Sequence, residues 1–144
     1  MSEQRRYWWT LRMSEDKLYY FLPYLATQQP EKISFDEVAK CVGPGWRRIL
    51  HETSEKLFKL GWDGGLLQVK EKMGSLRFYW QNNIGDPLIN DIAEDVVMVA
   101  EWKSEQTCEN CGKHGKIHCI NFWYMCRCND CLAEEKKKNE HLQE

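Results

Sequence analysis

Four cysteines in the last third of the chain constrain its fold more than any other feature. They form two C-x2-C pairs, Cys108 with Cys111 and Cys128 with Cys131, and residues 112–127 separate the pairs. A C-x2-C turn brings two thiolates together, and two such turns complete a closed tetrahedral shell around Zn²⁺. The gap between the pairs lies in the range typical of zinc sites. The sequence therefore predicts one structural zinc ion, because four protein ligands leave no open position for catalysis.

The residues around the two pairs predict how the zinc unit is built. Gly112 follows the first pair, as in a zinc knuckle on a tight turn. Strong helix formers from Leu132 to Lys138 follow the second pair, so its cysteines are expected at the start of a helix. Knuckle, hairpin and then helix is the order of a treble clef. We therefore expect a treble-clef-like zinc unit over residues 104–144.

Cys126 offers a rival ligand, because it lies two residues before Cys128. The alternation of Phe122, Tyr124 and Cys126 places it on a strand, where a buried or half-buried thiol is the simpler interpretation. The alternative without a metal is that these cysteines are unrelated buried or free thiols.

His114 and His118 are further alternatives, since histidine also binds zinc. Four well-spaced thiols favour ordinary loop positions for both histidines. His118 and Cys119 are not expected to act as base and nucleophile, because neighbours on a strand point to opposite faces. Cys41 and Cys119 are predicted to be bystanders.

Composition limits the class of protein. The chain has 144 residues, 42% of them hydrophobic, which is enough for one core. Its formal charge is −2; four thiolates and one Zn²⁺ would add two negative charges and give −4. The chain therefore lacks the basic excess of most nucleic-acid binders, which argues against that class of protein. No apolar run long enough for a signal peptide or a membrane span stands out, so we expect a cytoplasmic protein.

Local patterns predict three helices before the middle of the chain. Ser14 begins the first, with Leu18, Phe21, Leu22 and Leu25 at helical spacing. Ser34 and Glu37 have the spacing of a capping box and begin a short helix through about Cys41. The third runs from Trp46 to Leu60 and is followed by Gly61 at the C-cap.

A hairpin and a fourth helix follow. Residues 67–72 alternate, with Leu67, Val69 and Glu71 on one face, and residues 76–80 alternate in the same way after a turn at Gly74 and Ser75. Asp86 and Pro87 begin the helix. Its predicted buried stripe consists of Leu88, Ile92, Val96, Val99 and Ala100. The expected fold class is α+β: helices around an antiparallel β-hairpin in residues 1–103, packed with the zinc unit of residues 104–144.

The segment KEKMGSLRFY, residues 70–79, resembles part of a family of small uncharacterised phage and bacterial proteins. Matching features are Gly45 with Trp46, the CENCG sequence at residues 108–112, and Trp123 five residues before Cys128. The resemblance covers about residues 45–131 and departs from the family at Met73, where an aromatic residue is usual. It implies that Cys126 is not a ligand and suggests a phage or mobile-element setting, where small proteins often inhibit or neutralise another protein.

Two functions remain open. The first is a protein-binding module, of immunity or anti-defence type, that presents aromatic and Arg side chains to a partner. The candidate surface residues are Tyr7, Trp8, Trp9, Trp62, Arg77 and Tyr79. The alternative is a nucleic-acid-binding zinc protein. Its basic patch would consist of Arg47, Arg48, Lys70, Lys72 and Arg77, with Glu52, Glu55 and Glu71 interleaved. No catalytic motif is present, so we do not expect an enzyme.

Overall fold

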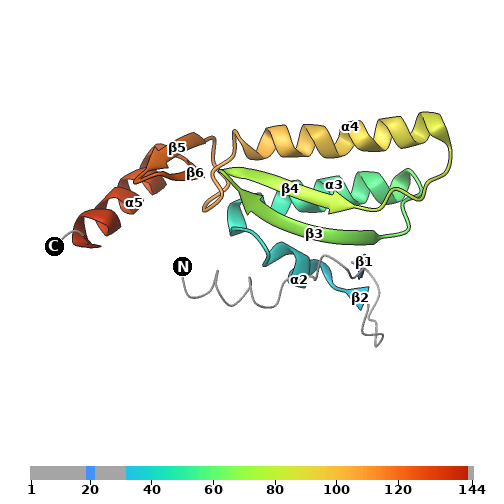
Figure 1. The fold of residues 1–144 in the computed structure, drawn as a ribbon, viewed down its shortest axis with the longest axis horizontal. Coiled ribbons are helices and arrows are strands. Elements are labelled where there is room, and N and C mark those ends of the chain that lie inside the picture. Colours follow the sequence, from blue (N-terminus) through green and yellow to red (C-terminus); the bar gives the residue numbers. More distant parts are fainter. Residues whose placement is uncertain (1–18, 22–31, 143–144) are drawn as a thin grey trace.

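The computed structural model describes residues 19–21 and 32–142, which form an α+β fold (Figure 1). Its centre is an antiparallel hairpin with two long helices packed against it. In chain order the elements are β1 Tyr19–Phe21, β2 Lys32–Ile33, α2 Phe35–Ala39, a 3₁₀ helix Pro44–Trp46, α3 Arg47–Lys59, β3 Gly65–Lys72, β4 Ser75–Trp80, α4 Pro87–Ser104, β5 Lys116–Ile120, β6 Trp123–Arg127 and α5 Asn129–Leu142.

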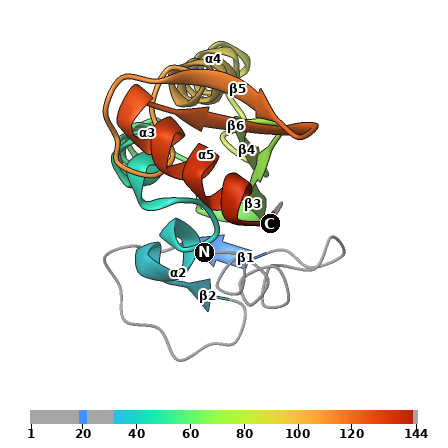
Figure 2. The same cartoon turned by 90° about the vertical axis from the view of Figure 1, so that its left-hand side faces the viewer.

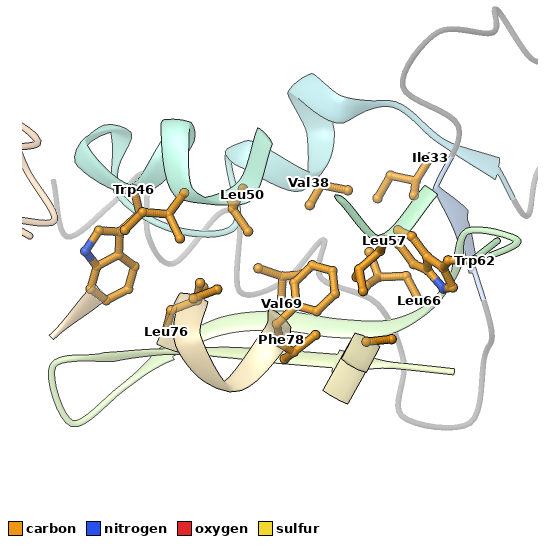
Figure 3. Close-up of a cluster of buried hydrophobic side chains, with 14 of the residues drawn as sticks. Ile33, Val38, Trp46, Leu50, Leu57, Trp62, Leu66, Val69, Leu76 and Phe78 are labelled. Atoms are coloured by element: carbon orange, nitrogen blue, oxygen red, sulfur yellow. The ribbon is translucent and has the colours of Figure 1, made fainter. Parts of the chain in front are cut away.

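The hydrophobic core lies between the β3–β4 hairpin and helices α3 and α4. Leu66, Val69, Leu76 and Phe78 are its members from the hairpin, and all four are buried. Trp46, which directly precedes α3, and Leu50 and Leu57, which lie within it, pack against these side chains (Figure 3). The same cluster includes Cys126 of β6. One continuous core therefore reaches from the hairpin to the C-terminal strands.

Two short strands extend the hairpin into a four-stranded sheet of order β2-β1-β3-β4. Strand β1 pairs parallel with β2 and antiparallel with β3. The helix predicted from Ser14 is therefore wrong for Tyr19–Phe21, and its remaining positions lie outside the described residues. Helical spacing is a weak signal in an aromatic run, because aromatic residues also favour strands when a sheet edge is available.

Local signals at the next two helices are confirmed. The hydroxyl of Ser34 accepts a hydrogen bond from the backbone N–H of Glu37 at the start of α2, as the capping box predicts. Helix α3 ends at Lys59, and Gly61 follows with a φ of 103°. A glycine is favoured there because other residues adopt this left-handed conformation at a cost.

The alternation predicted for β3 is wrong at its start. Leu66 and Gln68 are buried while Leu67 is exposed. The pairing with β4 shifts between Leu66, opposite Trp80, and Gln68, opposite Tyr79. Such a bulge inserts one extra residue and changes the faces of the side chains before it. The alternation predicted for β4 is confirmed, with Leu76 and Phe78 inward and Tyr79 exposed.

The buried stripe predicted for α4 is confirmed at Ala100, and Val96 is partly buried against the core, but the stripe is wrong at Leu88, Ile92 and Val99. The side chains that α4 buries are Ala93, Val97, Ala100 and Ser104. Leu88 is 76% exposed, and Ile92 and Val99 are exposed as well.

The rotation of α4 has a polar cause. Strand β4 lies at the edge of the sheet, and its N–H groups need partners. The N–H of Leu76 donates to the hydroxyl of Ser104 (2.9 Å), and the N–H of Phe78 donates to the carboxylate of Glu101 (3.1 Å). Helix α4 therefore presents its polar and small side chains to the hairpin, and its large apolar residues face outward.

The turn between β3 and β4 yields a stability prediction. Met73 has a φ of 54° and precedes Gly74 at 83°, a two-residue turn that favours Asn-Gly. A left-handed conformation costs a non-glycine residue about 1–2 kcal/mol, and Asn tolerates it better. Met73→Asn should raise the free energy of unfolding by about 1 kcal/mol in urea titration. Met73→Leu, which keeps the strain, should leave it unchanged; equal effects of the two variants would contradict the argument.

Candidate metal centre

The four predicted cysteines come together at one point of the structure. The sulfur atoms of Cys108, Cys111, Cys128 and Cys131 all lie within 4.8 Å of one another, and those of Cys111 and Cys128 are 3.6 Å apart. A tetrahedron with Zn–S bonds of about 2.3 Å has sulfur–sulfur edges of about 3.8 Å. The cluster can hold one metal ion, and its geometry is close to that of a zinc site.

Local backbone geometry positions the first pair. The N–H of Cys108 donates to the carbonyl of Lys113 (2.7 Å), and the N–H of Gly112 donates to the carbonyl of Cys108 (2.9 Å). Gly112 has a φ of 83°, which allows the chain to turn tightly after Cys111. This is the knuckle that the CENCG sequence predicts.

The second pair lies at the junction of β6 and α5, as predicted. The N–H of Cys131 donates to the sulfur of Cys128 (3.4 Å), and the side-chain amide of Asn110 donates to the sulfur of Cys131 (3.3 Å). The hydrogen bond from the Cys131 N–H lowers the pKa of Cys128 to about 7. A lowered pKa favours the thiolate, which is the form that binds a metal.

The other cysteines lie outside this cluster, and so do the two histidines considered from the sequence, His114 and His118. Cys126 is buried in the hydrophobic core, and burial raises its pKa to about 11. Burial likewise raises the pKa of Cys41 to about 11. Cys119 is exposed on β5, and His114 forms an isolated bridge with Thr107 beside the hairpin.

The position after Cys108 connects the metal centre to the rest of the protein. Glu109 is almost fully buried and lies 3.5 Å from the guanidinium of Arg127, which is also buried. Its carboxylate accepts a hydrogen bond from the N–H of Gly43 (3.0 Å), and its carbonyl accepts one from Gly45 (2.7 Å). Arg127 also reaches Glu135 of α5. The sequence analysis missed Glu109, because no local pattern marks a buried carboxylate inside a knuckle.

The loop before α3 packs directly against the knuckle. A Cβ added to Gly45 would lie 2.0 Å from the carbonyl oxygen of Cys108 and 2.5 Å from the N–H nitrogen of Gly112. The indole N–H of Trp46 donates to the carbonyl of Thr107 (2.8 Å). Residues far apart in sequence thus form one tightly packed junction beside the candidate metal centre.

The residues predicted to bind a partner differ in their exposure to solvent. Trp62 is 3% exposed, so its prediction as a surface residue is wrong: its indole donates to the carbonyl of Gly65 and its ring contacts Phe78. Tyr79 is exposed and Arg77 is half-buried, both on the hairpin face away from the core. Tyr7, Trp8 and Trp9 lie outside the described residues.

Acidic neighbours offset two charges of the alternative basic patch. Arg47 forms an ion pair with Asp36, and Arg48 forms one with Glu52 over 3.0 Å. The ammonium of Lys70 lies over the ring of Tyr79 at 5.6 Å. These pairings support a mixed, solvated face at this place.

Two exposed apolar surfaces were not predicted. The turn between β5 and β6 carries Phe122, 98% exposed, beside the exposed side chains of Trp123 and Tyr124. Phe122 has a φ of 65°, a conformation that costs such a residue about 1–2 kcal/mol. The other surface is the outer face of α4, and Trp102 is the last exposed apolar residue on it. Three consecutive aromatic residues at the turn of an expected hairpin were the signal for the first surface.

Comparisons with protein-family models, curated proteins and solved structures find no match to this chain. Among the described residues, the helices are too short or too polar to cross a membrane. The fold and the site define a small α+β protein with a four-cysteine metal-binding cluster.

The ligand set can be tested with paired cysteine variants. Purified protein should contain about one zinc per chain. Cys128→Ser should release the metal, because it removes a ligand, whereas Cys126→Ser should retain it, because that thiol lies in the core. Metal analysis by mass spectrometry measures both. Retention by Cys128→Ser together with loss from Cys126→Ser would overturn the assignment.

The junction beside the metal centre gives a second test. Gly45→Ala forces a methyl group onto the Cys108 carbonyl and should lower the free energy of unfolding by roughly 1–3 kcal/mol, the usual cost of overpacking. Gly85→Asn is the control, since Gly85 has no described atom within 4 Å of an added Cβ and Asn tolerates its φ of 89°. Urea titration of zinc-loaded protein measures both. Similar small losses would show that the junction is loosely packed.

Proposed function

We propose that this protein is a cytoplasmic, zinc-stabilised module that acts by binding another protein. In its concrete form the binding inhibits or neutralises the partner. The resemblance to small phage and bacterial proteins supports the inhibitory form, and the four-cysteine cluster supports zinc as the metal. The order of knuckle, hairpin β5–β6 and helix α5 supports a treble clef.

The outer face of α4 is the observation that carries the proposal. Its exposed large apolar residues are Leu88, Ile92, Met98, Val99 and Trp102. Leu88, Ile92, Val99 and Trp102 have the alternating spacing of four and three residues that forms a helical seam, with Asp95 in the middle. Figure 1 shows this helix along the outer side of the fold. Contiguous exposed apolar surface of this kind is typical of interaction sites.

Charge on the same helix defines the partner. Asp91, Glu94 and Asp95 are exposed among the apolar residues of α4. A complementary surface therefore combines apolar and basic side chains, as an amphipathic helix with Lys or Arg on its flanks does. A second copy of the chain is a poor occupant. Pairing two α4 helices about the middle of the seam would bring two Asp95 carboxylates together, and like charges repel.

The expected consequence is a large loss of partner binding when α4 becomes polar. Ile92→Glu with Val99→Glu should weaken binding by a factor of about 700, since each of the two anchors contributes about 2 kcal/mol and every 1.4 kcal/mol is about tenfold in affinity. The partner is first identified by crosslinking in the native host, then purified for titration calorimetry. Wild-type affinity in this variant would refute the proposed face.

Met73→Glu is the matched control for that experiment. It also exchanges an exposed apolar side chain for a carboxylate, but on the β3–β4 turn rather than on α4. Partner affinity should stay within about twofold of the wild type, because scattered surface charges contribute little. Zinc content and thermal unfolding of each variant show whether the fold is intact. Equal losses in control and α4 variants would indicate a general charge effect instead of a specific face.

A further inference from the structure

The tip of the β5–β6 hairpin is a strained, fully exposed aromatic turn. Ile120 pairs with Trp123, so Asn121 and Phe122 form the two-residue loop, with φ angles of 51° and 65°. Asn suits this conformation and Phe does not. Phe122 is 98% exposed, so packing within the described protein does not explain its choice. Strain retained in this way is characteristic of functional sites.

The strand register places aromatic rings around the whole tip. Trp123 shares one face of the hairpin with Ile120, His118 and Lys116, since paired residues and alternate residues share a face. Tyr124 pairs with Cys119 on the opposite face. Phe122 lies at the end between them. The tip therefore offers flat aromatic surfaces on both faces and at its apex.

The root of the hairpin is held firmly. Cys126 belongs to the core and Met125 is buried. Ile117 packs beside Gly74, where an added Cβ would lie 3.1 Å from the Ile117 side chain. Figure 2 shows α5 starting beside the β5–β6 hairpin, and Arg127 of β6 forms an ion pair with Glu135 of α5. The aromatic tip is thus presented on a rigid support.

Charge distinguishes this hairpin from the rest of the protein. Residues 112–127 contain Lys113, Lys116 and Arg127 but no Asp or Glu, although the whole chain is acidic. Arg127 is engaged with Glu109, whereas the side chains of Lys113 and Lys116 are exposed. The hairpin therefore combines an aromatic tip with two exposed lysines toward its root, since Lys116 pairs with Arg127 at the end away from Ile120 and Trp123. This is the opposite of the acidic α4 face.

From this combination we propose that the β5–β6 tip binds single-stranded nucleic acid. Unpaired bases stack on Trp123 and Phe122, and the ammonium groups of Lys113 and Lys116 contact phosphates. Bases in a duplex are already stacked on one another, so the tip favours single strands. The apical Asn121 and the lysines disfavour insertion into a bilayer, and Asn121 can donate to base edges. This site is independent of the α4 face and of the residues Arg47, Arg48 and Lys72 considered from the sequence.

Fluorescence anisotropy with labelled dT15 and U15 tests the proposal on the full, zinc-loaded chain. Trp123→Ala should weaken binding about 5- to 150-fold, the range for one base–aromatic stack. Met73→Ala is the control, because Met73 is 59% exposed, Trp123 is 62% exposed, and Met73 lies on neither proposed binding surface. The control should bind the oligonucleotides like the wild type. With two lysine contacts, the logarithm of affinity should fall with that of salt concentration with a slope of about −1.4.

Phe122→Gly separates a binding role from a structural one. Glycine relieves the left-handed strain, so thermal stability should rise or stay unchanged while oligonucleotide affinity falls at least fivefold. A fall in stability with unchanged affinity would overturn the proposal.

Three other outcomes would also overturn it. They are equal binding of wild type and Trp123→Ala, equal affinity for duplex and single strands, and partition of the tip into anionic phospholipid vesicles without oligonucleotide binding. A protein partner lost from Trp123→Ala, with no oligonucleotide bound by the wild type, would reassign the tip to a protein interface. Failure here leaves the α4 face untouched, because its variants are different and its readout is a protein.

Discussion

The buried carboxylate of Glu109 is the contact on which the arrangement of metal centre and core depends. Glu109 lies between two cysteines of the candidate metal centre. Its carboxylate contacts Arg127 and accepts from the N–H of Gly43, and its backbone carbonyl accepts from the N–H of Gly45. Removing one partner of a buried ion pair leaves an uncompensated charge at a cost of about 3–5 kcal/mol. A metal that holds Cys108 in place thereby also holds the loop that begins α3. The candidate zinc unit and the helical core are therefore energetically coupled, even though most of their residues are far apart in sequence.

Features with a local cause could be predicted from the sequence. The spacing of the cysteine pairs, the Ser34 cap and the glycine after α3 each depend on a few neighbouring residues, and the structure contains all of them. The orientation of α4 depends on distant groups instead. The N–H groups of Leu76 and Phe78 at the sheet edge donate to Ser104 and Glu101, and this fixes which side of α4 faces the hairpin. The spacing of apolar residues in the helix gives no sign of these contacts. A stripe that looks like core in the helix alone is therefore mostly surface in the protein.

The other errors have the same origin in non-local structure. Alternation along a strand assumes an uninterrupted ladder, so one bulge beside Leu67 reverses the expected face. Trp62 was ambiguous for a chemical reason, because tryptophan is frequent both in cores and in interfaces. The carbonyl of Gly65 accepts its indole N–H, and three aromatic rings enclose it, which resolves the choice. Strand β1 forms where the edge of β3 is available, which an isolated aromatic run cannot indicate.

Both candidate binding surfaces lower the free energy of unfolding of a chain this small. Exposed Leu88 and Trp102 contribute little to the core, and Phe122 adds strain without packing. Metal binding offers compensation, because a structural zinc site contributes an apparent 10–16 kcal/mol, roughly, to folding. The knuckle follows the end of α4 within a few residues, and the strained tip extends from the hairpin between the two cysteine pairs. One ion would then both offset the cost of the two surfaces and fix the position of the aromatic hairpin tip relative to the acidic, apolar face of α4.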